Sequence, residues 1–570
     1  MRRILVGVLA TIGAIALLLV GGGVAVAWML LGKSPELPEQ MILTLDLRDD
    51  LPEMRGGDPL GALGLKQRPT LIEITLGLEQ AARDPRVAGL VARVDGEGPN
   101  IAQVQELRAA LASFREQGKF AYAHADSFGE LGPGTVGYYL ATAFDEIHLQ
   151  PLGGLGLTGI LIETPLLRGL LDKLGIEPSG AKRGAYKHGA DIFTDSTLSP
   201  EHRESLQSLA DSFDRQIRSG IAVGRGIPIA EVGRLIDGGP YVAEEAHAAG
   251  LVDRLSYWPE VVDQAKSRAG AGSELIFFAA YAQATEPAPE DAPALALVQG
   301  VGQIRRGDSD HGPVGGWLMG ADTVAQALAD AIDDPDVAAI LFRIDSGGGS
   351  AVASETIGRE VRRAVAQGKP VIVSMAAAAA SGGYWIAMDA SRIVAEPGTL
   401  TGSIGVFAGK PVLRDFWDEL GVNWGQVGRG ANAAMWSNLV GYDGRGRARL
   451  EAFLDQIYAA FTEGVARGRD LSPEQALEVA EGRVWTGEQA KQLGLVDELG
   501  GFTRAVALAK EEGGIAPDQP VELRPFPRPR DIWDQALELL ADPPGLIDGV
   551  RPWLQLLEAG TLSAPPLVIR

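Results

Sequence analysis

The chain has 570 residues, and its hydrophobic fraction of 46% with 22% charged residues is typical of a globular protein of two or three domains. Its net charge of −23 argues against a nucleic-acid partner, because phosphates select basic surfaces. The absence of cysteine excludes disulfides and a cysteine nucleophile, and the six histidines show no metal-binding spacing. We therefore expect neither a metal nor a cofactor.

The N-terminus carries a long apolar stretch. Residues 4–32 contain no charged side chain, Arg2 and Arg3 precede them, and Lys33 follows. About 20 apolar residues span a bilayer, whereas the apolar region of a cleaved signal peptide, the alternative, has about 7–15. Residues 1–33 are therefore predicted to be an uncleaved transmembrane anchor with its N-terminus in the cytoplasm.

The next segments predict a stalk and a first α/β repeat. Residues 34–68 are rich in Pro, Gly and Asp, which favours a stalk. From 69 to 285, short apolar runs alternate with helical patterns, which predicts a parallel sheet with right-handed crossovers. The expected elements are strands at 87–94, 120–124 and 146–149 and helices at 102–117 and from 137 to 143.

A second repeat follows a linker. Residues 286–293 (E-P-A-P-E-D-A-P) are typical of a Pro-rich acidic linker, and 294–520 repeat the first pattern. The expected elements are strands at 337–344 and 370–374 and helices at 355–366, 449–467 and 473–481. Residues 521–570 form a C-terminal extension with apolar helical spacing at 532–540 and 550–557, which favours packing helices.

The register between the two repeats drifts slowly. The R-x-D pattern at 93–95 recurs at 343–345, an offset of 250, and G-L-V-D at 250–253 recurs at 494–497, an offset of 244. Solenoid repeats have periods of about 20–50 residues. The pattern therefore indicates duplication of a whole domain.

The two copies differ where reactive groups would lie. Ser403, in T-G-S-I-G at 401–405, falls opposite Leu157, and Lys187 falls opposite Ala433. A hydroxyl nucleophile needs a base. Because one copy has the lysine and the other the serine, the two copies could share one site.

Three local patterns could carry chemistry, although each also has an ordinary explanation. Gly402 and Gly405 permit a tight turn around Ser403, which could equally be a plain turn serine. D-S-G-G-G-S at 345–350 follows an apolar strand, and its N–H groups could bind an oxyanion or simply turn the chain. Lys187 could act as a base only if burial lowers its pKa; otherwise it is a surface lysine.

Together these patterns resemble a known family. The 345–350 turn, S-G-G-Y-W-I-A at 381–387, T-G-S-I-G at 401–405 and Y-K at 186–187 resemble the long, duplicated form of signal peptide peptidase A in serine peptidase family S49. The resemblance covers both repeats and the anchor. It implies an α/β fold of tandem duplicated ClpP/crotonase-like domains preceded by one transmembrane helix.

The resemblance also implies a Ser–Lys dyad. By motif match, Ser403 would be the nucleophile and Lys187 the general base. Gly348 and Gly349, with a backbone N–H near Ile404, would form the oxyanion hole.

The chain departs from the family pattern at two places. Members commonly read N-S-P-G-G-S where this chain has Gly347 in place of the proline, so the sequence leaves open which glycine donates. Residues 428–434 contain no hydroxyl that would orient the lysine amine. Ser381, Thr401 and Ser437 are the remaining candidates for that role.

The implied function is a membrane-anchored serine endopeptidase that degrades cleaved signal peptides and other apolar peptides. The implied location is the bacterial inner membrane, single-pass, with the catalytic part periplasmic, and the implied assembly is a homotetramer. Activity should rise towards alkaline pH. A crotonase-like acyl-CoA enzyme is one alternative, although CoA is cytoplasmic. A proteolytically inactive scaffold is the other, although decay would not be expected to retain one reactive group in each copy.

Overall fold

The computed structural model describes residues 37–55, 68–96, 98–284, 288–289, 291–311, 316–528 and 568–569. The predicted anchor and the two apolar stretches of the C-terminal extension lie outside these residues. Within the described ranges, no helix has the length and apolar character needed to cross a membrane.

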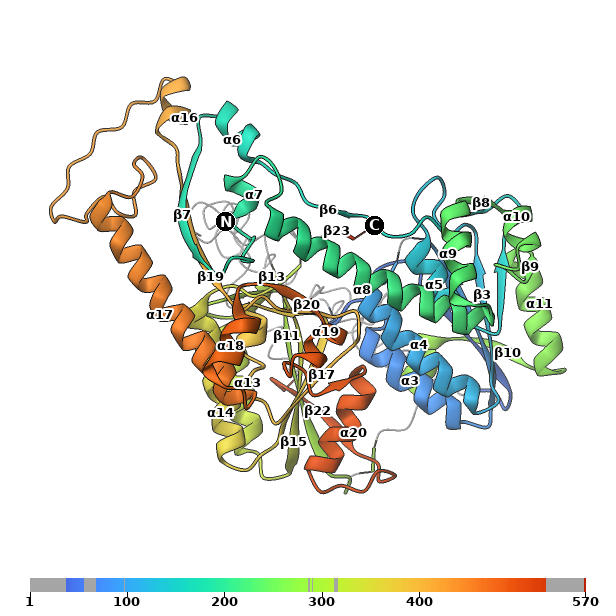
Figure 1. Cartoon of the computed structure of the whole chain (residues 1–570). Helices are drawn as coiled ribbons and strands as arrows, with labels where there is room; N and C mark the ends of the chain where they lie inside the picture. Colours follow the sequence, from blue (N-terminus) through green and yellow to red (C-terminus); the bar gives the residue numbers. More distant parts are fainter. Residues whose placement is uncertain are drawn as a thin grey trace, which may run out of the picture.

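The first repeat forms a six-stranded parallel sheet in the order β10-β1-β2-β3-β4-β9 (Figure 1). Strands and helices alternate along the chain as predicted. The strands are β1 (Met41–Asp46), β2 (Val87–Val94), β3 (Phe120–Ala125), β4 (Glu146–Leu149), β9 (Arg254–Leu255) and β10 (Glu274–Phe277). The main helices are α3 (Leu71–Arg83), α4 (Ile101–Glu116), α5 (Thr135–Ala141), α8 (Pro200–Arg225) and α11 (Trp258–Ala269).

Strand β1 lies within the segment 34–68 that was predicted to be a stalk. It lies between β10 and β2 in the sheet, and Met41, Ile42 and Leu43 have no exposed surface. The stalk prediction is therefore wrong for Met41–Asp46. A strand that is buried on both faces reads as a short apolar run without alternation, and the Pro- and Gly-rich flanks concealed it.

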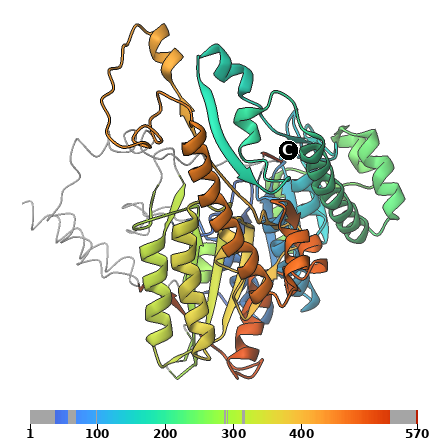
Figure 2. The same ribbon diagram turned by 60° about the vertical axis from the view of Figure 1, so that its left-hand side comes forward.

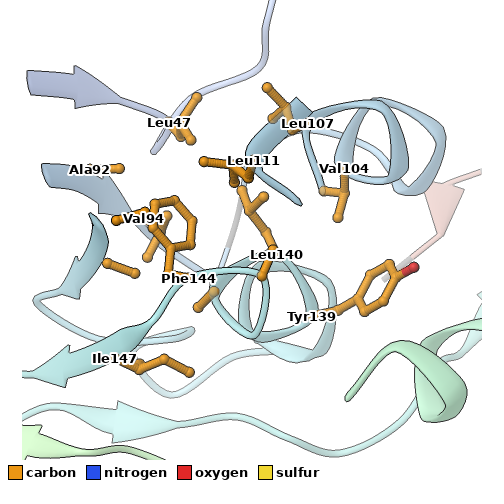
Figure 3. Packing of buried hydrophobic residues seen from close by; sticks show 14 of the residues in the cluster. Leu47, Ala92, Val94, Val104, Leu107, Leu111, Tyr139, Leu140, Phe144 and Ile147 are labelled. Carbon is orange, nitrogen blue, oxygen red and sulfur yellow. The ribbon is translucent and has the colours of Figure 1, made fainter. Parts of the chain in front are cut away.

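The core of the first repeat is built from these strands and helices. Val104, Leu107 and Leu111 of α4 belong to one buried cluster with Val94 of β2 and Leu140 of α5 (Figure 3). Their side chains are at most 1% exposed. Burying such residues contributes roughly 1.5–3 kcal/mol each, so this packing stabilises the sheet of the first repeat.

The second repeat forms an eight-stranded sheet with the path β20-β18-β16-β15-β11-β22; β17 pairs with β16, and β21 with β17. Its strands are β11 (Ala294–Val301), β15 (Val337–Ser346), β16 (Val371–Ala380), β17 (Arg392–Ala395), β18 (Leu400–Gly402), β20 (Val484–Thr486), β21 (Glu498–Leu499) and β22 (Glu522–Phe526). Its main helices are α13 (Ala321–Asp333), α14 (Ala351–Ala366), α17 (Gly444–Gly468), α18 (Pro473–Ala480) and α20 (Phe502–Glu512).

Shorter elements complete the described chain. The strands are β5 (Gly154–Leu155), β6 (Ile162–Glu163), β7 (Glu177–Arg183), β8 (Tyr241–Val242), β12 (Gln303–Arg305), β13 (Asp310–His311), β14 (Trp317–Gly320), β19 (Val406–Val412) and β23 (Val568–Ile569). The helices are α6 (Arg168–Lys173), α7 (Asp191–Thr194), α9 (Ile229–Gly238), α10 (Ala243–Ala248), α12 (Phe278–Ala284), α15 (Gly382–Trp385), α16 (Arg414–Glu419) and α19 (Gly487–Gln492).

The two repeats are joined by a two-stranded antiparallel sheet with one strand from each repeat. β7 of the first repeat pairs antiparallel with β19 of the second, with Arg183 opposite Val406 (Figures 1 and 2). The residues just after β7 therefore lie beside those just before β19. This pairing brings Lys187 to the turn that contains Ser403.

A buried ion cluster adds a second link between the repeats. Arg343 of β15 has no exposed surface, and its guanidinium donates to Glu53, which follows β1, and to Glu106 of α4, at 3.0 Å each. Its remaining nitrogen donates to Ser374 of β16 at 2.9 Å. Removing one partner of a buried ion pair costs about 3–5 kcal/mol, so this cluster disfavours separation of the repeats.

Candidate active site

Lys187 reaches from the first repeat into the second. Its Nζ donates to Ser403 Oγ at 2.9 Å, to the Ser403 carbonyl at 2.8 Å and to Ser381 Oγ at 3.0 Å. The residue is 5% exposed, and burial lowers the pKa of its amine to about 7. At neutral pH a large fraction of the amine is therefore uncharged and able to accept a proton.

Ser403 lies in the turn between β18 and β19. Its φ of +52° is unusual for a residue with a side chain, and its backbone N–H donates to the Arg483 carbonyl at 2.7 Å. Both its carbonyl and its hydroxyl accept from Lys187. Two bonds to one residue fix the direction of the amine.

Ser381 lies at a sharp strand-to-helix turn. It follows β16, precedes α15 and has φ +55° and ψ −117°. Its backbone N–H donates to the Gly402 carbonyl at 2.8 Å, and its hydroxyl caps no helix N–H. A strained serine between a strand and a helix is the arrangement that presents a nucleophilic hydroxyl in many hydrolases.

From the sequence alone, Ser381 is a candidate only for orienting the lysine amine. The pattern that could have drawn attention to it is a serine between small residues, A-A-S-G-G at 379–383, directly after an apolar strand. Of the other two candidates, Thr401 donates its hydroxyl to the Ala379 carbonyl and Ser437 accepts from Gln426. Neither is hydrogen-bonded to Lys187.

The glycine turn packs against the Ser381 turn through its backbone. A Cβ on Gly348 would lie 2.7 Å from the nitrogen of Gly382, and one on Gly382 would lie 3.2 Å from that of Gly349. The Gly348 N–H is occupied, because it donates to Ser346 Oγ at 3.1 Å. Among the described residues, the N–H groups of Gly349 and Gly382 have no hydrogen-bond acceptor. These two groups are available to an oxyanion.

A backbone N–H near Ile404 is the predicted oxyanion donor beside Ser403. Ile404 is not among the residues that line the cleft around Lys187, whereas Gly382 is. The N–H of Gly382, the residue that follows Ser381, is therefore a further candidate donor, and the role of the N–H near Ile404 stays a prediction.

The cleft is large and is formed by both repeats. It has a volume of about 1890 Å³ and contains Lys187, Ser381 and Ser403. Apolar side chains contribute to its walls, among them Ile192, Phe193, Leu209, Trp385 and Phe407. A cleft of this size can accommodate an extended, apolar peptide segment.

A group of potential metal ligands lines the same cleft. His188, Asp191 and His202 offer ligand atoms within 4.8 Å of one another. However, Asp191 already accepts from His188 Nδ1 at 2.8 Å and from Lys182 Nζ at 2.6 Å. The two imidazole rings are stacked, 4.2 Å apart and within 5° of parallel. Lone pairs in parallel planes do not converge on one ion, so the geometry fits an ion pair beside a ring stack better than a metal site.

Comparison with known proteins identifies the family. The profile described as "Peptidase family S49" matches residues 115–272 and 363–516, one stretch in each repeat. The chain belongs to peptidase family S49.

Several curated relatives of this S49 chain are similar over most of its length. "Serine protease SPPA, chloroplastic" from Arabidopsis thaliana is 30% identical, covering 86% of this chain and 71% of that protein. "Protease 4" from Haemophilus influenzae is 32% identical, covering 83% and 78%, and "Protease 4" from Salmonella typhi is 32% identical, covering 87% and 82%. The protein is accordingly a serine peptidase with two S49 repeats.

Solved structures also align with this S49 chain. A ClpP1 variant from Listeria monocytogenes is 16% identical and covers 37% of this chain and 94% of its own, with a TM-score of 0.24. The α/β architecture and the tandem repeats are confirmed. The finer ClpP/crotonase-like designation stays a prediction.

Proposed function

We propose that the protein is a membrane-anchored serine endopeptidase that uses Lys187 as its base and Ser381 as its nucleophile. The observation that carries this proposal is the 3.0 Å distance between Lys187 Nζ and Ser381 Oγ at a strained strand-to-helix turn. Nucleophilic catalysis by a hydroxyl requires a base within hydrogen-bond reach.

The choice of Ser381 over Ser403 depends on what surrounds each hydroxyl. Ser381 is followed by Gly382 and lies against Gly349, whose N–H groups have no acceptor in the described chain. Ser403 is followed by Ile404, which is not among the residues that line the cleft. A nucleophile needs oxyanion donors beside the carbonyl that it attacks, and this requirement favours Ser381.

The reaction would proceed by acyl transfer. Neutral Lys187 takes the proton of Ser381 Oγ as this oxygen attacks the peptide carbonyl. The N–H groups of Gly349 and Gly382 stabilise the oxyanion, and the Lys187 ammonium then gives its proton to the leaving amine. Water hydrolyses the ester by the same steps in reverse. Ser403 keeps the amine aligned throughout.

Ser403 as nucleophile is the second assignment, and its 2.9 Å distance to Lys187 Nζ favours it. A fluorophosphonate probe, followed by peptide mapping of the detergent-solubilised full chain, distinguishes the two. We expect the adduct on Ser381, no labelling of Ser381→Ala, and slow labelling at position 381 in Ser403→Ala. An adduct on Ser403 would reverse the two roles, and no adduct on either would support an inactive scaffold or an acyl-CoA enzyme.

The substrate and location are further parts of the proposal. The uncharged stretch at 4–32 supports an anchor in the bacterial inner membrane with a periplasmic catalytic part, and the apolar cleft walls support leftover signal peptides as substrates. A homotetramer is proposed from the family resemblance alone. Fractionation of membranes with protease accessibility from the periplasm tests the location, and a protein that washes off at alkaline pH would contradict an anchor.

A further inference from the structure

The loop that carries Lys187 is held by a segment of the second repeat. We call Glu481–Trp485, which leads into β20, the clamp segment. The Tyr186 N–H donates to the Glu481 carbonyl at 2.7 Å. Gly482 has φ +80°, and a Cβ there would lie 2.6 Å from the backbone nitrogen of Lys187. The two backbones therefore touch directly next to the lysine.

Arg483 is the centre of the clamp segment. Its guanidinium lies 5.1 Å from the ring centroid of Tyr186 and 4.4 Å from that of Trp485. Two of its nitrogens donate to Glu204 of α8, at 3.0 and 2.8 Å. Its carbonyl accepts the N–H of Ser403 at 2.7 Å. One residue thus contacts the lysine loop, the first repeat and the serine turn.

We propose that Arg483 is a positioning residue, which holds the Lys187 loop of one repeat against the Ser403 turn of the other. It does not contact Lys187 Nζ or Ser381 Oγ, so it would act through its neighbours. An arginine that donates two bonds to one carboxylate and lies over aromatic rings is rigid, and lysine cannot reproduce that geometry. The inference rests on the proposed role of Lys187 as the base.

The amine depends on this positioning because burial alone lowers its pKa. No charged neighbour contributes to that shift. If the loop moved away from the clamp segment, water would reach the amine and its pKa would rise towards the ordinary value of a lysine. Charged and titratable groups on the elements packed around the loop include Glu204 and His202 of α8, Glu481 and Arg483 of the clamp segment, and Lys182, Arg183, His188 and Asp191 on the first repeat.

The test is Arg483→Met in the detergent-solubilised full chain, since methionine keeps much of the packing and loses the charge and the planar fork. We expect kcat to fall by about 100-fold, the cost of a small misplacement of a catalytic group, while KM changes less than about twofold. The ascending limb of the pH profile of kcat/KM should move to higher pH. Glu204→Gln should lower kcat and move the ascending limb to higher pH as well, but both effects should be smaller. This variant remains informative if Arg483→Met does not fold.

Arg215→Met is the matched control. Arg215 of α8 pairs with Glu488 of the second repeat at 3.4 Å, so this pair also links the repeats but does not touch the site. We expect its pH profile and kcat to equal those of the wild type. If Arg483→Met and Glu204→Gln behave like this control, or lose activity only in proportion to unfolded protein, Arg483 has no positioning role.

A measurement without catalysis separates this inference from the proposed function. Competitive acylation of Lys187 across pH, read by mass spectrometry, reports the pKa of its amine whether or not it is the base. We expect a value near 7 in the wild type and a higher value in Arg483→Met. An unchanged value would overturn the positioning role, whereas an active Lys187→Met enzyme would overturn the base assignment alone.

Discussion

The two repeats share a scaffold but not their reactive groups. In the first, Tyr138 donates its hydroxyl to the Leu251 carbonyl at 2.7 Å, and in the second Tyr384 makes the same bond to Leu495 at 2.9 Å. These bonds connect equivalent elements at the centre of each core. Duplication has therefore preserved the internal bonds that stabilise the fold.

The positions around the site have diverged. Thr135 of the first repeat is equivalent to Ser381, but its hydroxyl accepts the N–H groups of Thr158 and Gly159, at 3.2 and 3.1 Å. Leu157, the equivalent of Ser403, has no exposed surface. In the first repeat these two positions therefore serve the structure. In the proposed site the first repeat supplies only the lysine and the second supplies the serines, so a complete site would need both repeats.

The largest effect should come from removing the one reactive group of the first repeat. We expect Lys187→Met to lower kcat/KM by at least about 10⁴-fold, because a hydroxyl without its base is a poor nucleophile. The melting temperature should stay equal or rise, since the substitution removes a buried amine. A peptide-hydrolysis assay and thermal unfolding of the purified variant measure these effects.

Lys410→Met is the matched control for that prediction. Lys410 lies in β19, is also 5% exposed, and donates to the Met435 and Ser437 carbonyls. Its loss should lower stability while leaving much of the activity of the folded enzyme. An active Lys187→Met enzyme would mean that the first repeat supplies no catalytic group.

The scaffold could be predicted from the sequence better than the site. Alternating apolar and helical patterns predicted β2, β3 and β4 to within one or two residues, because buried parallel strands are continuous apolar runs. Strand β1 was missed because its apolar run lies in a segment whose Pro, Gly and Asp content favours a stalk.

The site depends on features that residue types do not reveal. The complementary differences between the two copies suggested that Lys187 and Ser403 share one site. In the structure Lys187 Nζ lies 2.9 Å from Ser403 Oγ. The left-handed backbone of Ser381 and the absence of acceptors for the Gly349 and Gly382 N–H groups are tertiary properties. The position of Ile404 outside the cleft lining is likewise a tertiary property.

The next effect in size concerns pH. Because the pKa of Lys187 is lowered to about 7, kcat/KM should rise about tenfold per pH unit below that value and level off above it. The difference between pH 5 and pH 8 should then be about 100-fold. A profile that stays flat through neutral pH would place the essential base elsewhere.

The free energy of unfolding should also depend on pH through Lys187. The pKa of Lys187 in the folded state lies below its unfolded value, so between about pH 7 and pH 10.5 the unfolded chain binds more protons. The contribution of Lys187 to the free energy of unfolding therefore increases with pH across that window and is constant below it. Comparing the wild type with Lys187→Met in denaturant at several pH values isolates this contribution.

A smaller effect is expected at the equivalent position in the first repeat. Thr135→Ala removes the acceptor of two backbone N–H groups, which should cost roughly 1–3 kcal/mol of stability. Activity of the folded enzyme should stay within about twofold of the wild type. Ser381→Ala, at the matching position, should instead abolish activity with little change in stability. Similar losses of activity in both variants would contradict the division of labour between the repeats.

The smallest effect is expected where the chain departs from its family. Gly347 is exposed, its φ is not left-handed, and a Cβ there would meet no atom within 4 Å. The preceding Ser346 lies in β15 and is therefore extended, as a following proline requires. Gly347→Pro should raise the free energy of unfolding by about 0.4–1 kcal/mol through the unfolded state, with activity unchanged. A large loss of activity would mean that the site uses the flexibility of this turn.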